Sequence, residues 1–128
     1  EIEVLHRLEQ RLGIGARNGI HRLGHVAGNL ARYYSSKGQE VEIRVVAFNA
    51  GLNMLRTDRS PVLARLKSIS ESLPNVAFDA CSNTRENMAK NEGKKPEEIA
   101  LFADAKLVPS GVVTLVELNE QGWTILRP

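Results

Sequence analysis

The residue in this sequence best suited to chemistry is Cys81, its single cysteine. It ends the apolar stretch 75–81 and is followed by Ser82-Asn83-Thr84, residue types that commonly begin a helix. This order predicts a thiol at the carboxyl end of a strand, facing the first turn of the next helix. The backbone N–H groups and the dipole of such a turn stabilise a thiolate, which is the reactive form of cysteine. The position of Cys81 therefore fits two roles, a nucleophile or a buried, inert thiol.

A polar, glycine-containing loop follows a second apolar stretch, 40–48, which is predicted to be a strand. If the two strands are neighbours, this loop lies beside Cys81, because open α/β sheets bind ligands at the carboxyl ends of their strands. The loop and the helix start could then bind an anion or a polar ligand, and a tight turn without a binding role is the alternative. The residues expected to bind at these two strand ends are Asn49, Gly51, Asn53, Ser82, Asn83 and Thr84.

Other candidates for chemistry are less specific. His21 and His25 have the i, i+4 spacing that can bind a metal, but the residues between them lack the glutamate of a zinc hydrolase motif. We therefore expect a solvated histidine pair, no metal and no cofactor. The glycine-rich stretch 13–19 misses the G-x-G-x-x-G pattern of dinucleotide sites by one residue. Ser110 is expected to cap the helix that follows it. It does not lie in a G-x-S-x-G motif, which argues against an esterase.

These candidates must be positioned by alternating helices and strands. The spacing of apolar residues and the turn residues between them predict helices over 1–12, 20–37, 61–73, 84–90, 96–102 and 110–121 and strands over 40–48, 75–81, 106–109 and 123–126. Alternating elements imply βαβ crossovers and a sheet with helices on both faces. We predict an α/β fold, a three-layer α/β/α sandwich of flavodoxin-like architecture with a mostly parallel sheet of four to five strands.

Length and composition indicate one soluble domain. The chain has 128 residues, of which 42% are hydrophobic and 25% are charged. Its 17 basic and 15 acidic residues give a net charge of +2, without the basic excess typical of nucleic-acid binding. No apolar run approaches the roughly 18 residues that span a bilayer. We therefore expect neither nucleic acid nor a membrane as a partner.

Four segments, in order along the chain, carry a resemblance to a known family. They are VVAFNAGLNML (45–55), ACSNT (80–84), VPSGV (108–112) and QGWTILRP (121–128). In these segments the chain resembles the DsrE/DsrF-like proteins of sulfur relay and intracellular sulfur oxidation. The resemblance implies one small α/β domain over 1–128, commonly assembled into trimers or hexamers, and for some members a cysteine that carries a persulfide, here Cys81. The N-terminal segment 1–19 is atypical, because members usually open with an apolar strand and this segment is charged and helix-like.

The sequence thus predicts a sulfur-carrier or sulfurtransferase-like subunit that holds a persulfide on Cys81 and passes it to a partner thiol. The sulfur donor and acceptor would be other proteins or small thiols, because the chain has no second cysteine that could resolve the intermediate. The alternative is a non-catalytic ligand- or protein-binding assembly module of the same fold. We expect a homo-oligomer, a trimer or hexamer, in the cytoplasm or, after removal of a signal peptide, in the periplasm.

Overall fold

The computed structural model describes the backbone of residues 2–6, 10–14 and 19–126 and the side chains of residues 28–125. The strands are β1 (Ile2–His6), β2 (Gln10–Ile14), β3 (Ile43–Ala47), β4 (Val76–Cys81), β5 (Ala105–Val108) and β6 (Thr124–Leu126). The α-helices are α1 (Gly19–Ser36), α2 (Leu63–Ser72), α3 (Ser82–Asn91) and α4 (Gly111–Glu120), and two 3-10 helices are η1 (Asn49–Leu55) and η2 (Pro96–Glu98).

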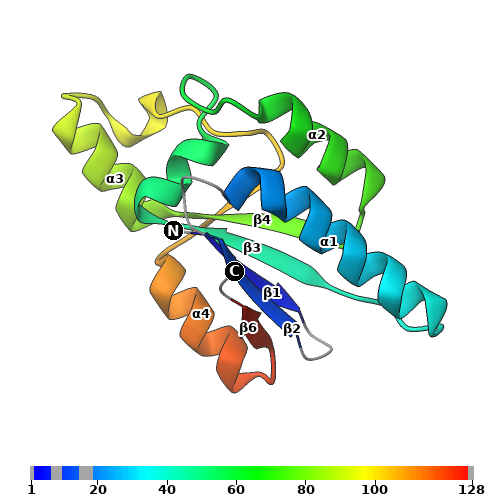
Figure 1. Ribbon diagram of the computed structural model, residues 1–128. Helices are drawn as coiled ribbons and strands as arrows, with labels where there is room; N and C mark the ends of the chain where they lie inside the picture. The colour runs from blue at the N-terminus through cyan, green and yellow to red at the C-terminus, as the bar shows by residue number, and fades with distance from the viewer. Residues whose placement is uncertain (1, 7–9, 15–18, 127–128) are drawn as a thin grey trace.

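The six strands belong to one sheet, in which β2-β1-β3-β4-β5 are successive neighbours and β6 pairs with β1. Figure 1 shows this sheet between the helices. β3, β4 and β5 are parallel neighbours, whereas β1 is antiparallel to β2, β3 and β6. It follows that β1 alone runs against the direction of the other strands. Helices cover both faces of this sheet, so the predicted α/β fold of flavodoxin-like architecture is confirmed. Within the described residues, however, the sheet has six strands rather than the four to five that were predicted.

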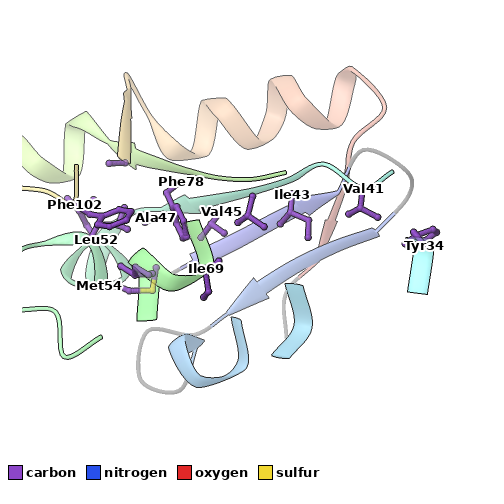
Figure 2. Packing of buried hydrophobic residues seen from close by; sticks show 14 residues of the cluster. Tyr34, Val41, Ile43, Val45, Ala47, Leu52, Met54, Ile69, Phe78 and Phe102 are labelled. Carbon is purple, nitrogen blue, oxygen red and sulfur yellow. The ribbon is translucent and has the colours of Figure 1, made fainter. Parts of the chain in front are cut away.

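The larger part of the core lies on the face covered by α1 and α2. Buried strand residues such as Val45 and Phe78 pack there against Leu66 and Ile69 of α2. Phe78 also meets Phe102 edge to face, with the ring centroids 5.8 Å apart (Figure 2). Such pairs stabilise a core beyond the burial of their apolar area.

A smaller apolar cluster lies on the opposite face, beneath α4. It contains Val46, Phe48, Cys81 and Leu118, all buried. Val46 points to this face and Val45 to the other, and neither is exposed. The near-continuous apolar run in β3 is therefore explained by burial on both faces of the sheet, as predicted.

The N-terminal segment differs from its prediction. A helix was expected over 1–12, but β1 and β2 form an antiparallel pair. Their register places Ile2 opposite Ile14 and Val4 opposite Leu12. β1 also pairs with β3 and β6, strands far away in the sequence. These long-range pairings override the local helical spacing, which is a weak determinant in so short a segment.

Several helix boundaries also differ from the pattern. The helix expected from Pro61 begins at Leu63, and the Oγ of Ser60 accepts a hydrogen bond from the N–H of Val62 at 3.3 Å. The helix expected over 96–102 is only the short 3-10 helix η2.

Within the described residues, none of the helices has the length and apolar character needed to cross a membrane.

Candidate functional site

Cys81 is both the last residue of β4 and the residue that caps α3. Its Sγ accepts a hydrogen bond from the backbone N–H of Thr84 at 3.4 Å. Ordinarily serine, threonine, aspartate or asparagine occupies this position, because their side-chain oxygens accept from the first turn. Here a sulfur atom takes that role. The predicted position of the thiol, at a strand end facing the first turn of a helix, is confirmed, but the helix begins at Ser82 rather than at residue 84.

The first turns of two helices meet at this sulfur. β4 and β5 are parallel neighbours in which Cys81 lies opposite Val108, so α3 and α4 begin at the same edge of the sheet (Figure 1). The N–H of Asn83 donates to the carbonyl of Pro109 at 3.4 Å and joins the two strand ends. The Oγ of Ser110 caps α4 by accepting from the N–H of Val113 at 3.4 Å, which confirms the expected capping role.

This arrangement sets the pKa of the Cys81 thiol below its ordinary value. Burial is the largest influence and raises the pKa, because it disfavours the charged thiolate. Hydrogen bonding to the Thr84 side chain and to the backbone N–H groups of Gly111, Thr84 and Asn83 lowers the pKa. Together these donors outweigh burial, so the site favours a thiolate more than an ordinary cysteine environment does.

Gly111 is needed where α4 approaches the end of β3. A Cβ atom at this position would lie 3.0–3.2 Å from side-chain carbons of Phe48. Contacts that short force the neighbouring atoms apart, and an aromatic ring in a packed cluster has little room to move. The glycine therefore allows the first N–H group of α4 to come close to the sulfur of Cys81.

The thiol is also enclosed by apolar side chains. Cys81 is only 4% exposed, and it packs with Val46, Phe48 and Leu118 beneath α4. Its environment thus combines a polar side, formed by N–H donors, with an apolar side. Any reagent must pass the apolar side to reach the sulfur.

The loop after β3 lies beside this site, as expected. Asn49 has a left-handed backbone (φ 51°), and its N–H donates to the Oγ1 of Thr84 at 3.0 Å. The N–H of Gly51 is used within the loop, donating to the carbonyl of Phe48 at 3.0 Å. Asn53 is half-buried, and its Oδ1 has no hydrogen-bond partner. The structure thus brings Asn49 to Thr84, whereas Gly51 has the role of a turn residue.

A buried ion pair on the same face as Cys81 was not predicted. Asp79 precedes Cys81 by two residues on β4, is 1% exposed and pairs with Arg44 of β3. Burial raises the pKa of Asp79, and the positive charges of Arg44 and Lys106 oppose this shift. The sequence does carry a signal, because Asp79 and Arg44 are charged residues inside otherwise apolar strands, where a charge requires a partner.

A small cavity adjoins this ion pair between β5 and α4. Its volume is about 250 Å³, and Arg44, Lys106, Val108 and Leu118 are among its lining residues. Val108 lies opposite Cys81 in the sheet, and Leu118 packs in the same cluster as Cys81. This cavity therefore lies beside the apolar cluster that contains Cys81, and a small molecule in it could approach the thiol.

A second unpredicted feature is the buried Arg56, which follows η1 and is 1% exposed. Its guanidinium donates to Glu92 at 2.6 and 3.0 Å and to Asp58 at 2.9 and 3.0 Å. These bonds raise the pKa of Arg56 and lower the pKa of Glu92 to about 2. The cluster joins the loop after η1 to the carboxyl end of α3, the helix whose first turn contacts Cys81.

The predicted absence of a metal site concerns both described residues and residues outside the described set. Among the residues whose side chains it describes, no three histidine, cysteine, aspartate or glutamate side chains come together as metal ligands would. His21 and His25 both fall within α1, but their side chains lie outside the described residues. The glycine-rich stretch 13–19 also lies largely outside them.

Comparison with known proteins supports the fold. No family model matches the chain, and no curated protein matches it. Among solved structures, it is similar to MTH1491 from Methanobacterium thermoautotrophicum, described as a protein of unknown function, with a TM-score of 0.65 and 26% sequence identity. The similarity covers 91% of this chain and 96% of that one. This α/β arrangement is therefore shared with another protein over nearly the whole chain, and the DsrE/DsrF-like resemblance stays a prediction.

Proposed function

We propose that this protein carries sulfur as a persulfide on Cys81. The observation that supports this most directly is the set of hydrogen-bond donors around the sulfur, the Thr84 side chain and the N–H groups at the starts of α3 and α4, which lower the pKa of the thiol. A carrier needs a thiolate, because the thiolate is the nucleophile in sulfur exchange. The resemblance to DsrE/DsrF-like proteins, in which some members carry sulfur at the matching position, agrees with this role.

The proposed chemistry is a pair of nucleophilic displacements. The Cys81 thiolate attacks the outer sulfur of a persulfide donor, R–S–SH; a new S–S bond forms, the donor's S–S bond breaks, and R–S⁻ leaves. The outer proton stays with the transferred sulfur or is lost to solvent. An acceptor thiolate then attacks the outer sulfur of the Cys81 persulfide and releases the Cys81 thiolate. The two steps are redox-neutral overall, and no oxidant or cofactor is required.

The residues around Cys81 have distinct roles in this scheme. The N–H groups of Thr84 and Gly111 stabilise the negative sulfur before attack and again after release. Asn49 positions Thr84 through its hydrogen bond to Oγ1. The acceptor thiol comes from another molecule, because Cys81 is the only cysteine in the chain.

Because Cys81 is buried beneath α4, a donor or acceptor can reach its sulfur only if this helix moves. Only Gly111, Thr114 and Leu118 of this helix are buried, and its outer side is exposed. An outward movement of α4 at Leu118, which lines the 250 Å³ cavity and packs with Cys81, would open a path between the cavity and the sulfur. We place this chemistry in the cytoplasm, where thiols stay reduced, with the periplasm as the alternative.

A second candidate function is a non-catalytic binding or assembly module of the same fold. The burial of Cys81 among Val46, Phe48 and Leu118 favours it, since buried structural cysteines are unreactive. In that case the capping hydrogen bond from Thr84 only stabilises the start of α3. The two functions differ in whether the thiol reacts at all.

The intact mass of the protein after incubation with a small alkyl persulfide tests the proposal. The carrier should gain one sulfur atom, the Cys81→Ser variant should gain none, and a later addition of a free thiol should remove the gain. Alkylation by iodoacetamide gives a second readout: a reactive thiol labels at pH 6, whereas an inert buried thiol resists even at pH 8. An unchanged mass together with resistance to alkylation would exclude the carrier and favour the binding module.

A further inference from the structure

We propose that a cavity at the amino ends of β3 and β4 binds an uncharged amphipathic small molecule. Its volume is about 690 Å³, within the roughly 300–1,000 Å³ range of small-molecule sites. It lies where α1 and α2 end, and both helices cover the same face of the sheet (Figure 1). Cys81 lies at the opposite end of β4, so this site is distinct from the proposed sulfur-carrying site and does not depend on it.

The inner wall of the cavity is apolar. Val41, Ile43 and Val76 line it and are 4%, 1% and 8% exposed. Figure 2 shows Val41 and Ile43 toward one end of the buried cluster. Leu73, which directly follows α2, and Ala31 of α1 add partly exposed apolar side chains. A wall of this kind favours an aliphatic or aromatic body, at about 25 cal/mol for each Å² removed from water.

The rim of the cavity offers neutral hydrogen-bonding groups. Ser35, Ser36 and Gln39 lie at the end of α1 and just beyond it, and Asn75 lies between α2 and β4. All four residues are exposed at the mouth. The Ser36 hydroxyl donates to the carbonyl of Tyr33 at 2.6 Å, so it can only accept a hydrogen bond from a ligand. The ligand should accordingly have a polar head attached to an apolar body.

The charges at the rim balance each other. One guanidinium, from Arg32, and one carboxylate, from Glu40, line the cavity. The Arg32 guanidinium also donates to the Oδ1 of Asn29 in the same helix, so it is partly engaged within the protein. The cavity therefore presents no net charge that would select an anionic or a cationic head.

The helix ends lead to the same conclusion. Both α1 and α2 point their carboxyl ends toward the cavity, and the partial negative charge there disfavours an anion. At the end of α1, the carbonyl of Tyr34 already accepts from the N–H groups of Lys37 and Gln39, which leaves it poorly placed to bind a cation. An uncharged head with hydroxyl or amide groups fits best.

Three amphiphiles with the same eight-carbon tail test this inference: octyl glucoside, octyl sulfate and octylammonium, each below its critical micelle concentration. Backbone amide shifts are followed by NMR during titration of the ¹⁵N-labelled protein. We expect saturable binding of octyl glucoside with the largest shifts around Ile43 and Val76, and weaker binding of both charged probes. Tighter binding of either charged probe would overturn the uncharged assignment, and the absence of saturable shifts at these residues would overturn the site.

Two cavity-filling variants and one control make the test specific. Ser35→Trp places a large side chain in the cavity, and Ser68→Trp places the same side chain on an exposed position of α2 that does not line it. The first should weaken binding by about tenfold or more, since the apolar contact area is lost, and the second should leave it unchanged. Asn75→Trp is the second filling variant if Ser35→Trp folds poorly. Equal affinity in a folded filling variant and in the control would contradict the proposal.

Discussion

At the scale of single residues, the reactivity of the Cys81 thiol depends on a few hydrogen-bond donors around its sulfur. Burial alone would raise the pKa of Cys81, and the Thr84 side chain, together with the N–H groups at the starts of α3 and α4, reverses this effect. Thr84 contributes through both its N–H and its side chain, and Gly111 through its N–H. Substitutions at these two positions therefore change the thiol without touching it.

Thr84→Val should raise the pKa of Cys81 and slow its alkylation near neutral pH. The change removes the Thr84 hydroxyl and with it the acceptor of the Asn49 N–H. Since Asn49 is exposed, the cost in the free energy of unfolding should be that of one ordinary hydrogen bond, about 0.5–1.5 kcal/mol. Thr84→Ser retains the hydroxyl and should restore most of the alkylation rate. The measurement is the rate of iodoacetamide labelling as a function of pH. A profile for Thr84→Val that coincides with that of the wild type would show that the hydroxyl has no influence on the thiol.

Gly111→Ala should both destabilise the fold and raise the pKa of Cys81. The new Cβ meets Phe48 at 3.0 Å and pushes the first turn of α4 away from the sulfur, with an overpacking cost of about 1–3 kcal/mol. Gly28→Ala is the matched control, because its Cβ meets only the flexible side chain of Arg32, at 3.2 Å, within a helix. Gly28→Ala should leave the free energy of unfolding unchanged or raise it by up to about 1 kcal/mol. Urea unfolding and alkylation rates measure the two effects, and similar behaviour of both variants would contradict the required close approach.

At the scale of secondary-structure elements, the predictions were correct where an element depends on residues close together in the sequence. The strand-to-helix junction at Cys81 and the capping by Ser110 were both predicted, because a cap depends on residues three apart. The hairpin of β1 and β2 was not, because its apolar residues also fit helical spacing and its partners β3 and β6 lie far along the chain. The sequence indicates that Asp79 needs a partner, but it does not show that this partner is Arg44, which is 35 residues away.

The Arg56 cluster predicts how stability depends on pH. The hydrogen bonds from Arg56 lower the pKa of Glu92 from 4.5 to about 2. Since the folded-state pKa is the lower one, this pair stabilises the fold above pH 4.5, and its contribution is lost as the pH falls toward about 2. Glu92→Gln should therefore be less stable than the wild type at neutral pH, and the difference should shrink over this acid range. Urea unfolding at a series of pH values measures it.

Glu86→Gln is the control for this experiment. Glu86 is exposed on the same helix, α3, so its substitution tests the loss of a carboxylate without the loss of the Arg56 pair. Its unfolding free energy should follow that of the wild type across the range. A stability difference for Glu92→Gln that stays constant between neutral and acid pH would contradict the role of the ion pair.

At the scale of the whole molecule, two surfaces are incompletely covered. β5 is an edge strand of the sheet, and its Leu107 is 45% exposed. On α4, Val112, Val113 and Val116 are 57%, 51% and 52% exposed. Exposed edges and clustered apolar side chains are features that other subunits commonly cover. They agree with the proposed homo-oligomer, and their position next to the start of α4 means that assembly and access to Cys81 would be coupled.

The oligomer prediction can be tested by light scattering at micromolar concentration. The wild type should give the mass of a trimer or hexamer, and Val112→Lys with Val116→Lys should shift it toward a single chain, because two charges cannot be buried in an apolar interface without partners. Both positions are exposed, so the isolated subunit should stay folded. Asn119→Lys, an exposed position at the other end of α4, is the control and should assemble normally. A wild-type protein with the mass of one chain would contradict the prediction, and an assembly that persists in the double variant would place the interface away from α4.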